Sequence, residues 1–184
     1  MRRLRPSTPV GMQPLDPRAK WRAILLSTLL LVPGYFALVI GLVSVATEGD
    51  GPPPGPFIAF GLSLVPFVFI ALAMLSQHPY ASGAVVKAMI LTLVVGIPVA
   101  GLTGDPATGM VAGIGAGGVV ALRAEPEHRY RARALAVAVA TIAIFVLVRV
   151  VPAVGLLLAA CLPFTSIGVA DHLVESRGAD QEAS

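Results

Sequence analysis

The sequence has little charge. Only 12% of its 184 residues are Asp, Glu, Lys or Arg, against about 25% in soluble domains, and 56% of its residues are hydrophobic. Because a domain of this size keeps a large surface relative to its volume, a soluble fold could not hide so much apolar surface. The composition therefore excludes an ordinary soluble domain and indicates an integral membrane protein.

Cysteine and reactive motifs are also scarce. Cys161 is the single cysteine, which excludes an internal disulfide and a cysteine-cluster metal site. The middles of the apolar segments lack the ionisable residues that proton relays, ion-coupled carriers and voltage sensors need. Neither H-E-x-x-H nor G-x-S-x-G occurs. We therefore expect no cofactor, no metal and no enzymatic activity.

Six long apolar segments fill most of the chain. About 20 helical residues cross a 30 Å hydrocarbon core, and helices satisfy their own backbone polar groups in lipid. The expected fold is all-α: a polytopic membrane protein with six transmembrane helices in a compact bundle with short loops. We expect the spans at about 23–46, 57–76, 84–102, 106–122, 134–151 and 153–170, between tails at 1–22 and 171–184. Asp105 is expected to cap the fourth helix, with Pro106 at its first position.

The basic residues indicate an orientation. With the N-terminus in the cytoplasm and six spans, Arg149 is the only one of the 13 lysines and arginines that falls on the outer side. This distribution follows the positive-inside rule and predicts that both termini are cytoplasmic. The usage of Ala, Gly, Val, Arg and Pro is typical of a GC-rich genome, so we expect a bacterial plasma membrane, the inner membrane.

A glycine-rich stretch lies in the fourth segment. Residues 113–118 match G-x-G-x-x-G, but a dinucleotide site needs a preceding strand and an acid about 20 residues further on, and neither is present. Gly109, Gly113 and Gly117 are instead four residues apart, on one face of a helix. Such a stripe predicts close helix packing in the membrane. The partner could be another span of this chain, a second copy or another protein. The last two partners would make a homo-oligomer or a hetero-oligomer through the fourth helix.

The polar loop before the fifth segment is strongly basic. We expect Arg123, Arg129, Arg131 and Arg133 to contact anionic lipid headgroups at the cytoplasmic face or an acidic protein partner. Nucleic acid is not expected as a partner, because Tyr130 is the only aromatic residue among these arginines.

Two functions follow from these features. The leading hypothesis is an accessory or assembly subunit without a catalytic site, packing in a membrane complex through the glycine-striped helix. The alternative is a small transporter or channel-like protein for a neutral or lipidic solute. It is motivated by the prolines inside predicted spans, which kink or break helices: Pro33, Pro66, Pro98 and Pro163.

These two functions, and an enzyme as a third class, make different structural predictions. A transporter should have a polar cavity between the kinked helices at mid-membrane. An enzyme, the least favoured class, would need His78, His128 and His172 to converge on its cytoplasmic side. A subunit needs neither feature.

Overall fold

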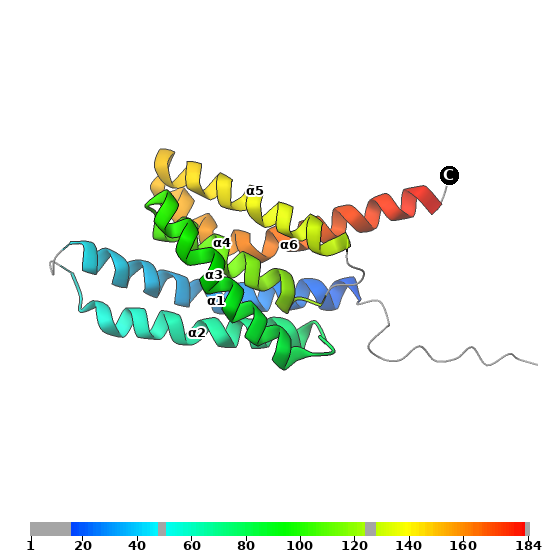
Figure 1. The fold of residues 1–184 in the computed structure, drawn as a ribbon, viewed down its shortest axis with the longest axis horizontal. Coiled ribbons are helices and arrows are strands. Elements are labelled where there is room, and N and C mark those ends of the chain that lie inside the picture. The colour runs from blue at the N-terminus through cyan, green and yellow to red at the C-terminus, as the bar shows by residue number, and fades with distance from the viewer. Residues whose placement is uncertain (1–15, 48–50, 124–127, 183–184) are drawn as a thin grey trace, which may run out of the picture.

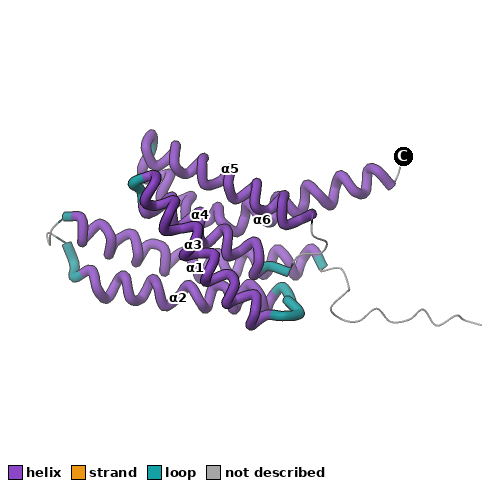
Figure 2. The backbone as a smooth tube through the Cα atoms, viewed as in Figure 1, coloured by secondary structure: helices purple, strands orange, loops and turns teal. Residues whose placement is uncertain are grey.

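The computed structural model describes residues 16–47, 51–123 and 128–182, and in these ranges the chain forms helices joined by short turns (Figure 2). The described residues contain no strand, which confirms the all-α class. The helices are α1 (Pro17–Ala46), α2 (Pro54–Leu75), α3 (Ala81–Thr103), α4 (Pro106–Ala121), α5 (His128–Val150) and α6 (Pro152–Glu182).

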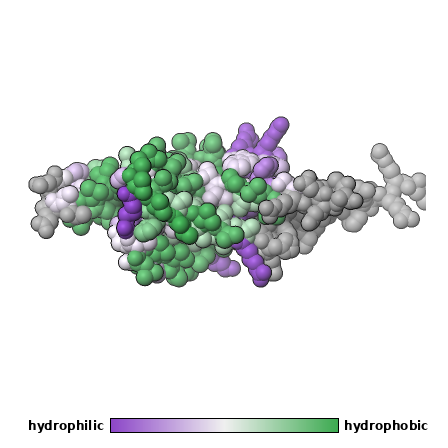
Figure 3. Space-filling view, turned by 90° about the horizontal axis from the view of Figure 1, so that it is seen from above, coloured by the Kyte–Doolittle hydropathy of each residue, from purple (hydrophilic) through white to green (hydrophobic). Residues whose placement is uncertain are grey.

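Five of these six helices are long and apolar enough to cross a membrane, as expected for a helical membrane bundle. Figure 3 shows an apolar surface over most of one face, with hydrophilic side chains gathered mainly at one end. The exception is α4, whose 16 residues extend about 24 Å. Twelve of those 16 residues are buried. α4 is therefore a covered central helix, shorter than a helix that spans the hydrocarbon core alone.

The turn between α3 and α4 shows how the sequence sets the helix ends. Gly104 ends α3 with a φ of 64°, a left-handed conformation that glycine adopts without steric cost. The expected cap of α4 is confirmed: the Asp105 carboxylate accepts hydrogen bonds from the N–H groups of Ala107 and Thr108 at 3.1 and 3.0 Å. Pro106 occupies the first position of α4, where its missing N–H costs nothing.

Successive helices run in opposite directions (Figure 1). The starts of α1, α3 and α5 therefore lie at one end of the bundle, together with the ends of α2, α4 and α6; we call it the Arg133 end. The most extensive contacts join α1 to α2, α3 to α4 and α5 to α6. α4 also packs against α2, α5 and α6, while α6 returns to α1. This arrangement places α4 at the centre.

Three helices extend furthest beyond the predicted span boundaries, and one of them is α5, which begins at His128 although its span is expected from about residue 134. α1 begins at Pro17, inside the stretch that we predicted as a tail. α6 continues to Glu182, and its last turns project beyond the other helices (Figure 1). A helix satisfies its own backbone hydrogen bonds in water as well as in lipid, so the end of an apolar run does not end a helix. Residues of all three extensions enter the site described next.

Candidate functional site

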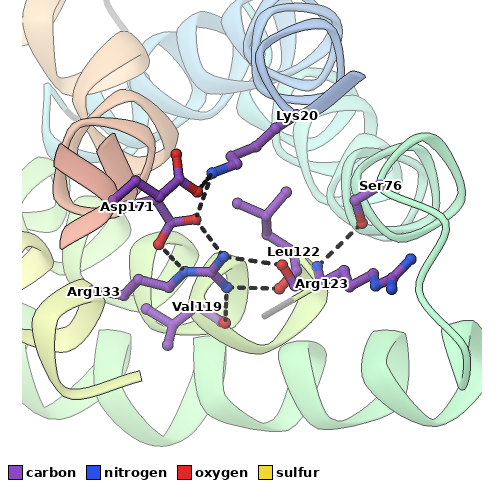
Figure 4. Close-up of polar contacts among 8 residues, drawn as sticks. Lys20, Ser76, Val119, Leu122, Arg123, Arg133 and Asp171 are labelled. Carbon is purple, nitrogen blue, oxygen red and sulfur yellow. Dashed lines mark hydrogen bonds and ion pairs between the residues drawn. The ribbon is translucent and has the colours of Figure 1, made fainter. Parts of the chain in front are cut away.

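A buried arginine is the centre of the Arg133 end. Arg133 lies on the second turn of α5 and its side chain is inaccessible to solvent. Its Nε and Nη2 donate to the two carboxylate oxygens of Asp171 on α6, at 2.7 and 2.6 Å. Nη1 donates to the carbonyls of Val119 and Leu122, at 3.2 and 2.7 Å, and Nη2 donates to that of Arg123 at 3.0 Å (Figure 4). These five hydrogen bonds match the five N–H groups of a guanidinium.

The carboxylate of Asp171 also faces α1. Lys20 Nζ lies 3.6 Å from Asp171 Oδ2 and donates to Glu175 Oε1, one turn further along α6, at 2.5 Å. The Lys20 and Asp171 side chains are 5% and 1% exposed, whereas Glu175 is one-third exposed. We call Lys20, Arg133, Asp171 and Glu175 the ion cluster. It joins α1, α5 and α6 (Figure 4).

The ion cluster closes the end of α4. The last carbonyls of a helix have no partner within the helix and carry its negative partial charge, so a cation is stabilising there. Arg133 supplies both the charge and the donors. The Arg123 N–H, just beyond α4, donates to Ser76 Oγ at 3.2 Å, and Ser76 is completely buried. The short α4 thus leaves space at the Arg133 end that polar side chains fill.

A histidine lies near this cluster. His78 is in the turn between α2 and α3, and its Nδ1 accepts the Tyr80 N–H at 3.1 Å. Burial, followed by the positive charges of Arg123 and Lys87, lowers the pKa of His78. His172 on α6 is exposed to solvent, and the side chain of His128 lies outside the described residues. Among the residues that the structure describes, no three His, Cys, Asp or Glu side chains are grouped so as to hold a metal.

The predicted basic contact residues separate into different environments. Arg131 is exposed, as a lipid or partner contact requires, whereas the side chain of Arg129 lies outside the described residues. Arg133 and Arg123 are 0% and 6% exposed, so the expectation that they present their charge to lipid or a partner is wrong. α5 begins at His128, before its apolar run, so Arg133 is already helical and its side chain meets the end of α4 at the Leu122 carbonyl. Arg123 directly follows α4, and its N–H donates to the buried Ser76.

The three glycines of the predicted stripe lie against α3. A methyl group added to Gly109 would lie 2.7 Å from the carbonyl oxygen of Gly96 on α3, and one added to Gly113 would lie 3.0 Å from the Gly96 Cα. At Gly117 it would lie 2.8 Å from the Ala88 carbonyl oxygen. Real Cβ atoms essentially never come within 3.0 Å of another atom, so these glycines permit the observed approach of the two backbones.

Two other glycines of α4 approach other helices. A methyl group on Gly115 would lie 2.6 Å from a methyl of Val137 on α5, and one on Gly118 would lie 2.7 Å from the Phe164 ring on α6. Small residues on several faces of α4 therefore let it pack centrally against three helices.

Sequence reasoning did not identify Lys20, Asp171 and Ser76 as site residues. A usable signal was present: Asp171 is a lone acid at the end of an apolar run, on the side to which all basic residues except Arg149 were assigned. An acid in that position needs a cation, and Arg133 precedes the apolar run of the neighbouring helix.

A groove runs along the bundle between α3 and α5. It has a volume of about 510 Å³, and its floor is one side of α4; we call it the α3–α5 groove. The residues that line it are Leu91, Val95, Val99, Ala112, Ala116, Val119, Val120, Ala134, Val137, Ala138, Thr141 and Ile142. Among the described residues that line the groove, only Thr141 has a polar side chain, and its hydroxyl donates to the Val137 carbonyl within α5 at 2.8 Å. The groove therefore offers an apolar surface.

No protein-family model matches the chain, and no curated protein and no solved structure is significantly similar to it. The ion cluster and the α3–α5 groove are thus the features from which a function can be inferred.

Proposed function

We propose that this protein is a non-catalytic accessory or assembly subunit of a membrane complex, and that it receives one apolar transmembrane helix of a partner protein in the α3–α5 groove. The observation that carries the proposal is the uncovered strip of α4. Its other faces are covered by α2, α3, α5 and α6, but Ala116 and Val120 remain partly exposed on the groove floor. A further helix in the groove would complete the burial of α4.

The spacing of alanines in the groove suits a helix. Ala112 and Ala116 lie four residues apart on the floor, and Ala134 and Ala138 lie four apart on the α5 wall. Residues four apart are neighbours along one helix face, so each alanine pair leaves a shallow depression one helical turn long. Small residues at such positions let a second helix approach closely, and close packing drives helix association in lipid.

The partner surface differs from the one that the sequence suggested. The glycine stripe of α4 lies against α3 of the same chain, which leaves it covered within the bundle. The proposed contact to another protein is therefore the neighbouring face of α4, the one with Ala112 and Ala116.

The chemistry of the polar groups supports a packing role. Each N–H of Arg133 has an acceptor within the chain, so this guanidinium has no donor left for a ligand. The hydroxyls of Thr92, Thr141 and Thr165 donate to carbonyls of their own helices. These groups stabilise the bundle, whereas a path for a polar solute needs polar groups that face a water-filled cavity.

A lipidic ligand is the second candidate for the same groove. Its volume of about 510 Å³ falls within the range of about 300–1,000 Å³ that is typical of small-molecule sites. A carrier of a lipidic solute would bind there without any partner protein, which separates this alternative from the subunit proposal.

The proposal is tested by filling the groove from its wall. Ala138 is exposed, so Ala138→Phe places a phenyl ring in the groove without disturbing a buried contact. We expect this variant to lose the partner during purification in mild detergent while the bundle stays folded. Ala59→Phe on α2 is the matched control, since Ala59 is equally an exposed helical alanine but does not line the groove. Equal retention of the partner by both variants would contradict the proposal.

The same proposal places the Arg133 end in the cytoplasm of a bacterial plasma membrane. The support is the positive-inside distribution: among the lysines and arginines that the structure describes, Arg149 alone lies at the opposite end of the bundle. A C-terminal reporter that is active only in the periplasm should therefore be silent, and an active reporter would overturn this orientation.

A further inference from the structure

The first turns of α1 border a second hollow at the Arg133 end. It has a volume of about 770 Å³ and lies between the start of α1 and Leu75 at the end of α2. Two arginines, Arg18 and Arg22, and the single tryptophan, Trp21, line it together with Leu25. Unlike the α3–α5 groove, this hollow combines charged and apolar side chains.

The two arginines are placed to act together. Arg18 and Arg22 are four residues apart, so they are neighbours on one face of α1. Both are exposed, and within the described part of the chain neither guanidinium forms an ion pair. Lys20, between them in sequence, points the other way and is used by the ion cluster. The hollow therefore has two cationic groups available for an anion.

Asp16 is the one acid among the described residues that line the hollow. Its carboxylate accepts the Arg18 N–H at 3.1 Å and caps α1. This carboxylate offsets one of the two guanidinium charges. The remaining charge is positive, and the N-terminus of α1 adds a positive partial charge at the same place.

The polarity of the hollow changes along α1. Trp21 is 41% exposed, and tryptophan side chains favour the membrane interface. Leu25, one turn further into the membrane-spanning part of α1, and Leu75 on α2 are 68% and 40% exposed. Along α1 the hollow thus passes from guanidinium groups to an indole and then to leucines. A phospholipid presents its groups in the same order: a phosphate, an interfacial region and an acyl chain.

We infer that this hollow binds an anionic phospholipid, with the phosphate at Arg18 and Arg22 and an acyl chain along Leu25 and Leu75. Guanidinium groups bind phosphate oxygens through charge-assisted hydrogen bonds. This site takes the role that the sequence assigned to Arg123 and Arg133, which are buried. It lies on α1 and α2, away from the α3–α5 groove, and does not depend on the proposed function.

Trp21 provides the readout, because it is the only tryptophan and lines the hollow. The protein is reconstituted in phosphatidylcholine vesicles that contain a small fraction of brominated phosphatidylglycerol or, in parallel, the same fraction of brominated phosphatidylcholine. Bromine quenches tryptophan at short range. We expect stronger quenching by the phosphatidylglycerol, because two arginines enrich it near Trp21 by about fivefold each at low ionic strength.

Matched variants decide whether the arginines cause this preference. Arg18→Gln and Arg22→Gln should each reduce the relative association constant for phosphatidylglycerol by about fivefold, and the double variant should remove the preference. Arg131→Gln removes an exposed arginine of α5 that does not line the hollow, so it should leave the quenching of Trp21 unchanged whether or not Arg131 contacts lipid elsewhere. Equal quenching by the two lipids in the wild-type protein, an equal effect of Arg131→Gln, or reversal by inorganic phosphate at constant ionic strength would overturn the inference.

Discussion

Replacing Arg133 with methionine should strongly destabilise the bundle. The substitution leaves Asp171 buried with Lys20 as its remaining cation, at 3.6 Å, and removes the donors from the carbonyls of Val119, Leu122 and Arg123. Removing one member of a buried ion pair costs about 3–5 kcal/mol. Because Lys20 still compensates part of the Asp171 charge, we expect the lower half of that range, about 3–4 kcal/mol.

The fluorescence of Trp21 can measure this loss. Trp21 packs against α6 at Gly168, so its emission reports the separation of α1 from α6 during a denaturant titration in detergent. Arg131→Met is the matched control on the same helix, and because Arg131 is exposed its effect should stay within about 0.5 kcal/mol. If Arg133→Met and Arg131→Met unfold at the same denaturant concentration, the ion cluster does not stabilise the bundle.

A double-mutant cycle separates the ion pair from the helix cap. Asp171→Leu alone leaves Arg133 without its carboxylate, but the three carbonyls of the α4 end keep their donors. Combined with Arg133→Met, it removes both charges. We therefore expect the double variant to lose less stability than the sum of the single variants, by about 1–3 kcal/mol. Additive losses would show that the two side chains act independently.

Two further predictions concern the packing of α4 and the pH dependence of stability. Gly113→Ala should destabilise the bundle by about 1–3 kcal/mol, because the new methyl group meets the backbone of Thr92 and Gly96, whereas Gly101→Ala, which meets open space, should be neutral or stabilising in the same unfolding assay. His78 has a lowered pKa in the folded protein, so the unfolded chain binds the proton more readily. Its contribution to the free energy of unfolding should be complete above its usual pKa of 6.5 and fall as the pH drops through the folded-state pKa. His78→Gln should remove this part of the pH dependence, and an unchanged profile would contradict the assignment.

Much of the fold could be predicted from the sequence, because apolar length and helix-breaking residues act locally. The α3–α4 turn is an example: Asp105 and Pro106 start α4 where predicted, and Gly104 ends α3. The central position of α4 was harder to foresee. The spacing of Gly109, Gly113 and Gly117 predicts one stripe, whereas Gly115 and Gly118 also approach neighbouring helices, and that follows only from the packing of the whole bundle.

The ion cluster could not be predicted from residue types alone. Arg131 and Arg133 are two residues apart in the same polar stretch, yet one is exposed and the other is inaccessible. Their difference depends on the direction in which α5 presents each side chain and on the short α4, which leaves its last carbonyls within reach of Arg133. Such a pairing joins residues 38 positions apart in sequence, so it depends on the tertiary arrangement of the helices.

The most direct test of the proposed function is photo-cross-linking from the α3–α5 groove in native membranes, with a photoreactive residue at position 138 and, as a control, at position 59. The subunit proposal predicts an adduct from position 138 whose cross-linked peptide is an apolar transmembrane segment of another protein. That adduct should be absent from position 59 and lost on Ala116→Phe, which fills the groove floor. Adducts from position 138 that contain lipid alone, or the same protein adduct from position 59, would contradict it.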